Sequence, residues 1–303
     1  MGDPAPTDHP VIIEAAINGI TSKARNPHVP VEPEEIAADA LACIEAGAAI
    51  VHNHIDGMAP SPEAAAERYL QGWRPVLAER PDALLYPTVH IASGGISYEH
   101  QVPLAESGAL RIGLVDPGSV NLGGVDADGV PVGGFVYANS FDTIERAFAI
   151  CREHRLGPNL AIYEPGFLRA VRAWEQAGRL PAGALAKLYF ATERGYMGAP
   201  FGLPPTLAAL DAYTELLAGS SVAWAASVVG GDLVASTVAR AAIERGGHLH
   251  VGLEFFAGDR TPRNAELVQE AVALVHDTGR RGATPAEAAD LLGLPAVGAR
   301  SLS

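Results

Sequence analysis

The chain has 303 residues, of which 48% are hydrophobic and 18% charged, a balance typical of a globular protein with a sizeable core. Its formal charge of −14, from 21 basic and 35 acidic residues, would repel a phosphate backbone, so we expect no nucleic-acid partner. The sequence contains no run of about 18 apolar residues and no signal-peptide pattern, which predicts a cytoplasmic enzyme with no membrane contact.

Short apolar runs rich in Val, Ile and aromatic residues alternate with helical patterns along the chain. Eight strands are expected to begin near Val11, Ala49, Leu84, Leu110, Asn159, Ala186, Val222 and His248. The helices between them are expected to begin near Pro33, Ser61, Tyr98, Ser140, Phe167, Pro204, Asp232 and Pro262. This repeat is typical of a parallel sheet, and eight units predict an α/β protein with a single (β/α)₈ TIM barrel domain over residues 1–303.

Three segments depart from the repeat. Residues 116–139 are glycine-rich and long for a strand-to-helix connection, which predicts a hairpin excursion or an active-site loop at the rim. Residues 1–10 are expected to form a flexible N-terminus, and residues 283–303 a C-terminal extension with a short helix and a tail. Cys43 and Cys151 fall in amphipathic helical segments and are expected to be buried as small apolar residues.

Two histidines two residues apart end the second expected strand. Side chains at alternate positions of a strand share a face, so His52 and His54 can reach one ion at the end of the barrel where catalytic groups gather. Catalytic zinc commonly takes three protein ligands, and the last expected strand offers His248, His250 and Glu254 on one face. The alternative is that the pair are core histidines with hydrogen-bond partners.

Further polar residues lie in or just after the expected strands. Glu14 interrupts an apolar strand, so it needs a cation or hydrogen-bond donors nearby. Glu164, at the end of strand five, is a candidate acid, base or amine-binding group, and each of these two acids could instead be structural. Asn18 ends strand one, and Lys23 and Arg25 follow as local cations, either for substrate contact or as surface residues.

The end of the third expected strand carries a second group of candidates. Its Ser93, Gly94 and Gly95 offer a hydroxyl and free backbone N–H groups that could bind an anionic oxygen. His90 lies on the same strand, on a face that could point into the barrel.

An ordered set of motifs covers the chain from about Val11 to Leu292. It comprises NG and NPHVPVEPEEIAADALACIEAGAAIVHNH near the start, SGG after strand three, DPGSVNLG after strand four, IYEPG after strand five, and VGLE with a later NAELV. With this set the chain resembles the β-keto acid cleavage enzyme family, which includes 3-keto-5-aminohexanoate cleavage enzyme.

The resemblance implies a zinc-dependent barrel, usually a homo-oligomer such as a dimer or tetramer. The implied reaction is a retro-Claisen exchange between a β-keto acid and acetyl-CoA, giving acetoacetate and a new CoA thioester. The implied zinc (Zn²⁺) ligands are His52, His54 and Glu254, and Glu164 matches the position that helps to recognise the substrate's distal group. The loop with Lys23 would be able to meet the acyl-CoA.

The sequence departs from the family pattern at several positions. Members with this activity typically carry an Asp after the ligand Glu and an Arg four residues before it, as a catalytic dyad, and here these positions are Phe255 and His250. The first-loop acid of the cleavage enzyme aligns near Thr21, and the serine of strand three aligns with Ala92, which Ser93 follows.

The missing dyad leaves three hypotheses open. His250, His90 or Glu14 could supply the base. Alternatively the metal scaffold supports a hydrolase or lyase reaction on a keto acid without acetyl-CoA. A third reading is a metal- or metabolite-binding protein without catalysis.

Overall fold

The computed structural model describes residues 9–55, 59–92 and 95–295. Its eight-stranded parallel sheet has the order β3-β2-β1-β12-β11-β10-β9-β6, and the end strands β3 and β6 contact each other, so the sheet curls into a barrel. The strands are β1 (Ile13–Ala16), β2 (Ile50–Asn53), β3 (Leu84–Pro87), β6 (Ile112–Val115), β9 (Gly157–Ile162), β10 (Leu185–Ala191), β11 (Ala223–Val229) and β12 (His248–Val251). The predicted (β/α)₈ TIM barrel is confirmed.

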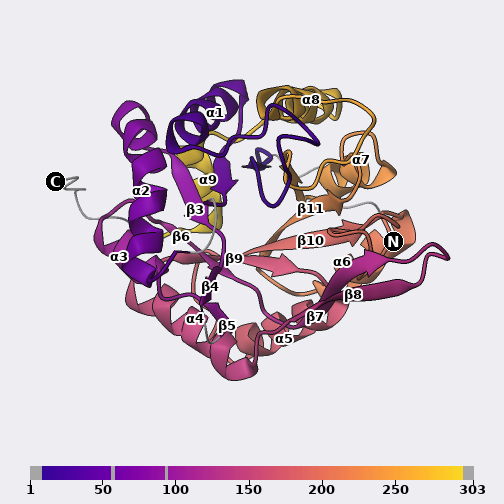
Figure 1. Ribbon diagram of the computed structural model, residues 1–303, viewed down its shortest axis with the longest axis horizontal. Helices are drawn as coiled ribbons and strands as arrows, with labels where there is room; N and C mark the ends of the chain where they lie inside the picture. The colour runs from indigo at the N-terminus through magenta and orange to yellow at the C-terminus, as the bar shows by residue number, and fades with distance from the viewer. Residues whose placement is uncertain (1–8, 56–58, 93–94, 296–303) are drawn as a thin grey trace.

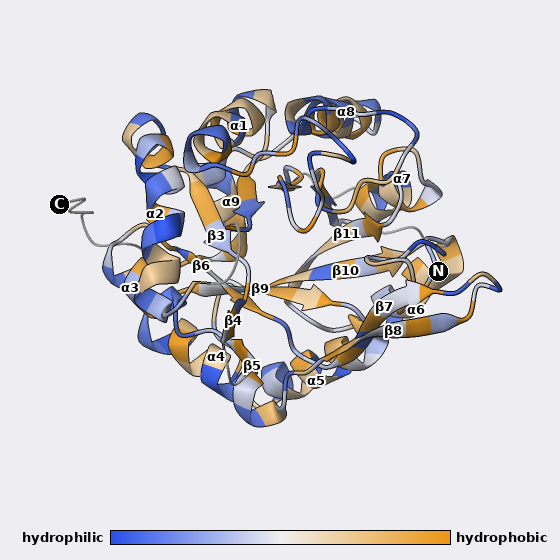
Figure 2. Cartoon of the chain, viewed as in Figure 1, coloured by the Kyte–Doolittle hydropathy of each residue, from blue (hydrophilic) through white to orange (hydrophobic). Residues whose placement is uncertain are grey.

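Helices surround the barrel (Figure 1). They are α1 (Pro33–Ala46), α2 (Pro62–Glu79), α3 (Gln101–Glu106), α4 (Phe141–Glu153), α5 (Pro165–Gln176), α6 (Leu207–Leu216), α7 (Thr237–Glu244) and α8 (Asn264–Asp277). Ser61, Ser140 and Thr206 cap three of them by accepting a hydrogen bond from the backbone N–H three residues on. In Figure 2 the helices show mixed faces, because their apolar side packs on the strands.

Some element boundaries differ from the prediction. Helices α6 and α7 begin at Leu207 and Thr237, later than expected. The third strand ends at Pro87, whose missing N–H cannot extend the ladder. The chain then forms a separate antiparallel pair, β4 (His90–Ala92) with β5 (Gly95–Ser97), so the expectation of one long strand is wrong.

The glycine-rich excursion is a hairpin. Strands β7 (Val120–Val125) and β8 (Pro131–Tyr137) pair antiparallel and project from the rim (Figure 1). Residues 116–139 were expected to form either a hairpin or an active-site loop, and the structure shows a hairpin.

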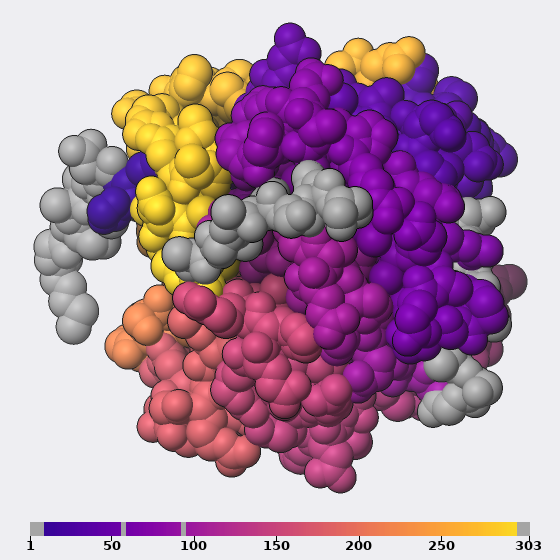
Figure 3. Space-filling model, turned by 90° about the vertical axis from the view of Figure 1, so that its left-hand side faces the viewer, coloured from indigo at the N-terminus to yellow at the C-terminus, as the bar shows by residue number. Residues whose placement is uncertain are grey.

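The C-terminal helix α9 (Pro285–Leu292) lies at the amino ends of the strands. Gly282 bridges to Val11 just before β1, and the leucine after α9 lies near Gly157 at the start of β9. The yellow C-terminal segment accordingly lies beside earlier parts of the chain in Figure 3. Most of the expected N-terminal segment, residues 1–8, and the expected tail, residues 296–303, lie outside the described residues.

The helices and strands bury a large apolar core and, inside the barrel, a smaller set of polar side chains. Cys43 and Cys151 are free and buried in it, as expected. Among the described residues, no helix is long and apolar enough to cross a membrane.

Candidate metal centre

Three side chains from two neighbouring regions of the barrel converge at the carboxyl ends of its strands. His52 lies in β2, His54 is the first residue after that strand, and Glu254 lies in the turn after β12. His52 Nε2 lies 3.4 Å from Glu254 Oε2, and His54 Nε2 lies 3.2 Å from Glu254 Oε1. One ligand atom from each residue lies within 4.8 Å of the other two, a spacing that fits a single ion.

A turn, not a strand, delivers Glu254. The expectation that the last strand extends to Glu254 is wrong, because β12 ends at Val251 and Gly252 takes φ +131°. A Cβ on Gly252 would lie 2.1 Å from the carbonyl oxygen of Ala16, so the turn needs glycine. The buried Asn264 of α8 holds the turn by accepting a hydrogen bond from the Leu253 N–H at 2.8 Å.

The first loop packs against the same carboxylate. A Cβ on Gly19, which has φ +57°, would lie 2.2 Å from Glu254 Cγ. Thr21 Oγ1 donates to the carbonyl of Leu253 at 2.9 Å. Thr21 therefore supports the turn that carries Glu254, and it also lines the cleft beside His54, so its contact with substrate stays a prediction.

Asn18 fixes the backbone of His54. Its Oδ1 accepts from the N–H groups of His54 and Gly19, both at 2.8 Å, and its Nδ2 donates to the carbonyls of His54 and Pro30 at 3.1 and 3.0 Å. These four bonds use the full capacity of the amide. Asn18 thus holds the backbone of His54 in place, and because it also lines the cleft beside His54, its contact with substrate stays a prediction.

The protonation states suit a cation. His52 Nδ1 lies 3.3 Å from the carbonyl oxygen of Tyr86, which can only accept, so the proton is on Nδ1 and Nε2 is free to ligate. Burial lowers the pKa of His52 to about 3 and keeps the ring neutral. Burial also acts to raise the pKa of Glu254, but its close contacts with the rings of His54 and His52 outweigh burial and bring the pKa to about 2.

Two of the ligand atoms lack hydrogen-bond partners. Within the described part of the chain, neither His54 Nε2 nor Glu254 Oε2 makes a hydrogen bond, although both atoms are buried. Buried polar atoms are normally paired, so their orphaned state points to a missing partner. Two imidazoles and one carboxylate are a donor set that suits zinc, and the residues therefore fit the ion that the family resemblance implies.

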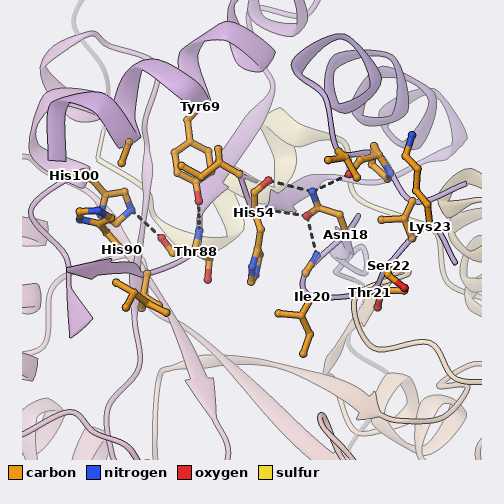
Figure 4. A pocket seen from close by; sticks show the side chains of 18 residues that line it. Asn18, Ile20, Thr21, Ser22, Lys23, His54, Tyr69, Thr88, His90 and His100 are labelled. Atoms are coloured by element: carbon orange, nitrogen blue, oxygen red, sulfur yellow. Dashed lines mark hydrogen bonds between the residues drawn. The ribbon is translucent and has the colours of Figure 1, made fainter. Parts of the chain in front are cut away.

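A cleft of about 620 Å³ opens beside this cluster. Figure 4 shows His54 in its wall, with Asn18 and Lys23 on one side and Thr88, His90 and His100 on the other. The cleft is large enough for a small molecule next to His54.

The remaining predicted site residues are spread around the rim. Lys23 lines the cleft but is ion-paired with Glu35, whereas Arg25 is exposed and is not among the described residues that line it. His90 lines the cleft, and its Nε2 contacts the carbonyl of Ala59 at 2.9 Å. Gly95 begins β5 and is exposed. Ser93 and Gly94 lie outside the described residues.

Glu164 belongs to a different cavity. It precedes α5, and its Oε1 accepts from the N–H of Gly202 at 2.9 Å. It lines a cavity of about 460 Å³ beneath the β7–β8 hairpin, together with Phe201. The cleft beside the metal ligands and the Glu164 cavity thus lie on different parts of the rim.

The other histidines of β12 are not part of the group formed by His52, His54 and Glu254. His248 Nδ1 accepts from the N–H of Ile12 at 3.0 Å, at the amino end of the barrel. His250 is buried, with Nδ1 3.0 Å from Ser227 Oγ and Nε2 3.2 Å from Glu14 Oε1. The cation that Glu14 requires is Lys187 of β10, 3.6 Å away.

Sequence reasoning missed three residues near this site. Lys187 is the only charged residue of an otherwise apolar strand, LAKLYFA, and that exception was the available signal. Asp116, just after β6, is buried, its Oδ1 has no partner in the described structure, and burial raises its pKa to about 6. Asn264 lies in the NAELV motif, where nothing in the pattern indicates its contact with the ligand turn.

Comparison with known protein families identifies the family to which the chain belongs. The sequence model for beta-keto acid cleavage enzymes matches residues 10–294. The chain belongs to the β-keto acid cleavage enzyme family. The resemblance to this family that the sequence motifs indicated is therefore confirmed.

Relatives in this family match nearly end to end. The 3-oxoadipate:acetyl-CoA acetyltransferase of Cupriavidus necator is 28% identical over 295 residues, covering 95% of this chain and 96% of the relative. The 3-keto-5-aminohexanoate cleavage enzyme of Fusobacterium nucleatum is 27% identical over 294 residues, covering 94% of this chain and 98% of the relative.

A solved structure supports the fold. ObcA in a binary complex with oxaloacetate superposes with a TM-score of 0.67 at 16% identity, covering 90% of this chain and 69% of the ObcA chain. This likeness concerns the barrel architecture.

Proposed function

We propose that the protein is a zinc-dependent β-keto acid cleavage enzyme that exchanges the acyl group of a β-keto acid with acetyl-CoA. The bond between the keto carbon and the adjacent methylene breaks, and the acetyl group takes the place of the original acyl group on that methylene. The products are acetoacetate and the CoA thioester of the original acyl group. The relative from Cupriavidus necator, which is named as an acetyltransferase that uses acetyl-CoA, supports this choice.

The observation that carries the proposal is the cluster of His52, His54 and Glu254 beside a cleft in a chain of this family. When bound there, zinc would supply a Lewis acid for the oxygen atoms of the keto acid. The chain itself keeps His52 neutral and Glu254 ionised, and it excludes water from Glu254 by burial.

The identity of the base stays a proposal. His250 and Glu14 are fully buried against each other, so they would act by supporting the centre and not by touching the substrate. His90 lines the cleft and is the better placed of the predicted candidates to contact substrate. Glu164 is retained as a candidate for the substrate's distal group, through the cavity under the hairpin.

The test is a panel of β-keto acids with the zinc-analysed protein, with and without acetyl-CoA, following acetoacetate. Acetoacetate formed only with acetyl-CoA is the expected result. Product without acetyl-CoA would replace the proposal with a hydrolase or lyase, and zinc binding without any turnover would favour a binding protein.

The ligand set has its own test. His52→Ala is expected to abolish stoichiometric zinc, whereas His248→Ala, at the other end of the same barrel, is expected to retain it. Full zinc occupancy in His52→Ala would refute the assignment.

A further inference from the structure

A layer of polar side chains crosses the barrel beneath the metal ligands. Glu14 pairs with Ile50, two residues before His52, so it lies one layer deeper than that ligand. Its neighbours come from strands around the barrel and share almost complete burial; they are Tyr86, Asn159, Lys187 and His250. The chain has only two lysines, and Lys187 is one of them.

The carboxylate of Glu14 is the hub of this layer. Its Oε2 accepts from Asn159 Nδ2 at 2.9 Å, and its Oε1 accepts from the Tyr86 hydroxyl and lies 3.2 Å from His250 Nε2. Burial acts to raise the pKa of Glu14, but the charges of Lys187 and His250 outweigh it and hold the pKa below its usual range. Glu14 is therefore an ionised carboxylate inside the barrel, balanced by the Lys187 ammonium.

Tyr86 connects this charge pair to the metal centre. Its hydroxyl donates to Glu14 and accepts from Lys187 Nζ at 2.7 Å, so it is held from two sides. Its ring stacks on the imidazole of His52, with centroids 4.4 Å apart and an interplanar angle of 25°. Its carbonyl oxygen also lies 3.3 Å from His52 Nδ1, so one residue meets the ligand with both its ring and its backbone.

We propose that Lys187 and Glu14 are positioning residues for the metal centre, which act by holding Tyr86 against His52. The charge pair fixes the Tyr86 ring through its hydroxyl, and the ring and carbonyl then fix the orientation and tautomer of the imidazole. The inference rests on the proposed metal centre. Groups that orient a metal-binding imidazole typically raise metal affinity 10- to 100-fold, which sets the expected effect at about that size.

The competing explanation is a purely structural one. A buried ion pair can be retained without any role in a site, since removing one partner leaves an uncompensated charge that destabilises the fold. The experiment must therefore separate effects on zinc and His52 from effects on stability.

Tyr86→Phe is the sharpest variant, because it removes one oxygen and keeps the ring. We expect zinc affinity, measured by competition with a chromogenic chelator, to fall by about 10- to 100-fold. The matched control is Tyr213→Phe in α6, since the Tyr213 hydroxyl is buried and has no hydrogen-bond partner among the described residues. That control is expected to bind zinc as the unmodified protein does.

A charge-neutral double variant provides the second arm. Lys187→Met alone leaves Glu14 buried without its cation, so a large loss of stability is expected. Lys187→Met combined with Glu14→Gln removes both charges in similar volumes and is expected to recover the melting temperature of the metal-free protein but not the zinc affinity. Recovery of both, or an unchanged zinc affinity in Tyr86→Phe, would overturn the proposal.

A metal-free readout separates this inference from the proposed centre. The ¹⁵N resonances of the His52 imidazole are expected to report the Nδ1–H tautomer in the unmodified protein and a mixture of tautomers in Tyr86→Phe. An unchanged tautomer would overturn the positioning role. Failure of the unmodified protein to bind zinc would instead refute the metal centre, and the tautomer would still test the contact with Tyr86.

Discussion

Gly19→Ala is expected to damage the metal centre without touching any metal ligand. The new Cβ would lie 2.2 Å from Glu254 Cγ, whereas carbon atoms in contact prefer about 3.5 Å or more. Glu254 would have to move by roughly 1.3 Å to relieve the overlap. Zinc–oxygen bonds are about 2.0–2.2 Å long, so a shift of that size breaks the coordination. We expect zinc affinity to fall by about 100-fold or more.

The control for this prediction is Gly178→Ala. Gly178 also has a left-handed backbone, φ +66°, but a Cβ there would meet nothing within 4 Å. Both variants should lose about 1–2 kcal/mol of stability from the strained backbone. Only Gly19→Ala should lose zinc in a chelator competition assay, and equal zinc affinities in the two variants would refute the steric argument.

Two further predictions concern the supports of the fold. Asn264→Ala leaves the Leu253 N–H and the Ile17 carbonyl without their hydrogen bonds of 2.8 Å each. The free energy of unfolding, measured in urea, is expected to fall by about 2–6 kcal/mol, and zinc binding is expected to weaken. A fall in the free energy of unfolding of less than about 1 kcal/mol would contradict this prediction. His248 has its pKa lowered by burial from 6.5 to about 4, so its unfolded form takes up a proton first as the pH falls. The stability that neutral His248 contributes is present above pH 6.5 and is lost towards pH 4, by up to about 3 kcal/mol. Urea unfolding from pH 7.5 to 4.5 should therefore show a steeper decline in the unmodified protein than in His248→Asn, and parallel declines would contradict the assignment.

The sequence was sufficient to predict the barrel and the position of the histidine pair. The alternation of apolar runs and helical patterns reflects burial against a shared core, which is local information. His52 and His54 were also predictable, because the two-residue period of a strand places them on one face. The helix starts near Ser61 and Ser140 were predicted as well, and both serines cap their helices in the structure.

The route by which Glu254 reaches the histidines was not predictable from local pattern. It depends on Gly252 meeting the backbone of Ala16 and on Asn264 holding the turn, and both contacts join segments far apart in the sequence. The buried pair of Glu14 and Lys187 has the same character, since 173 positions separate residues 14 and 187. A strand pattern shows that such a residue needs a partner but does not say which strand supplies it.

The ligand turn gives the metal centre a place in the order of assembly. His54 and Glu254 stand 200 positions apart, from residue 54 to residue 254, and they meet only through the neighbouring strands β2, β1 and β12. A growing chain therefore carries two histidines for most of its synthesis without the carboxylate that completes the set. All three residues can bind one ion only after β12 has paired with β1. Metal binding would therefore come late in folding and would stabilise the contact between the first and last strands of the barrel.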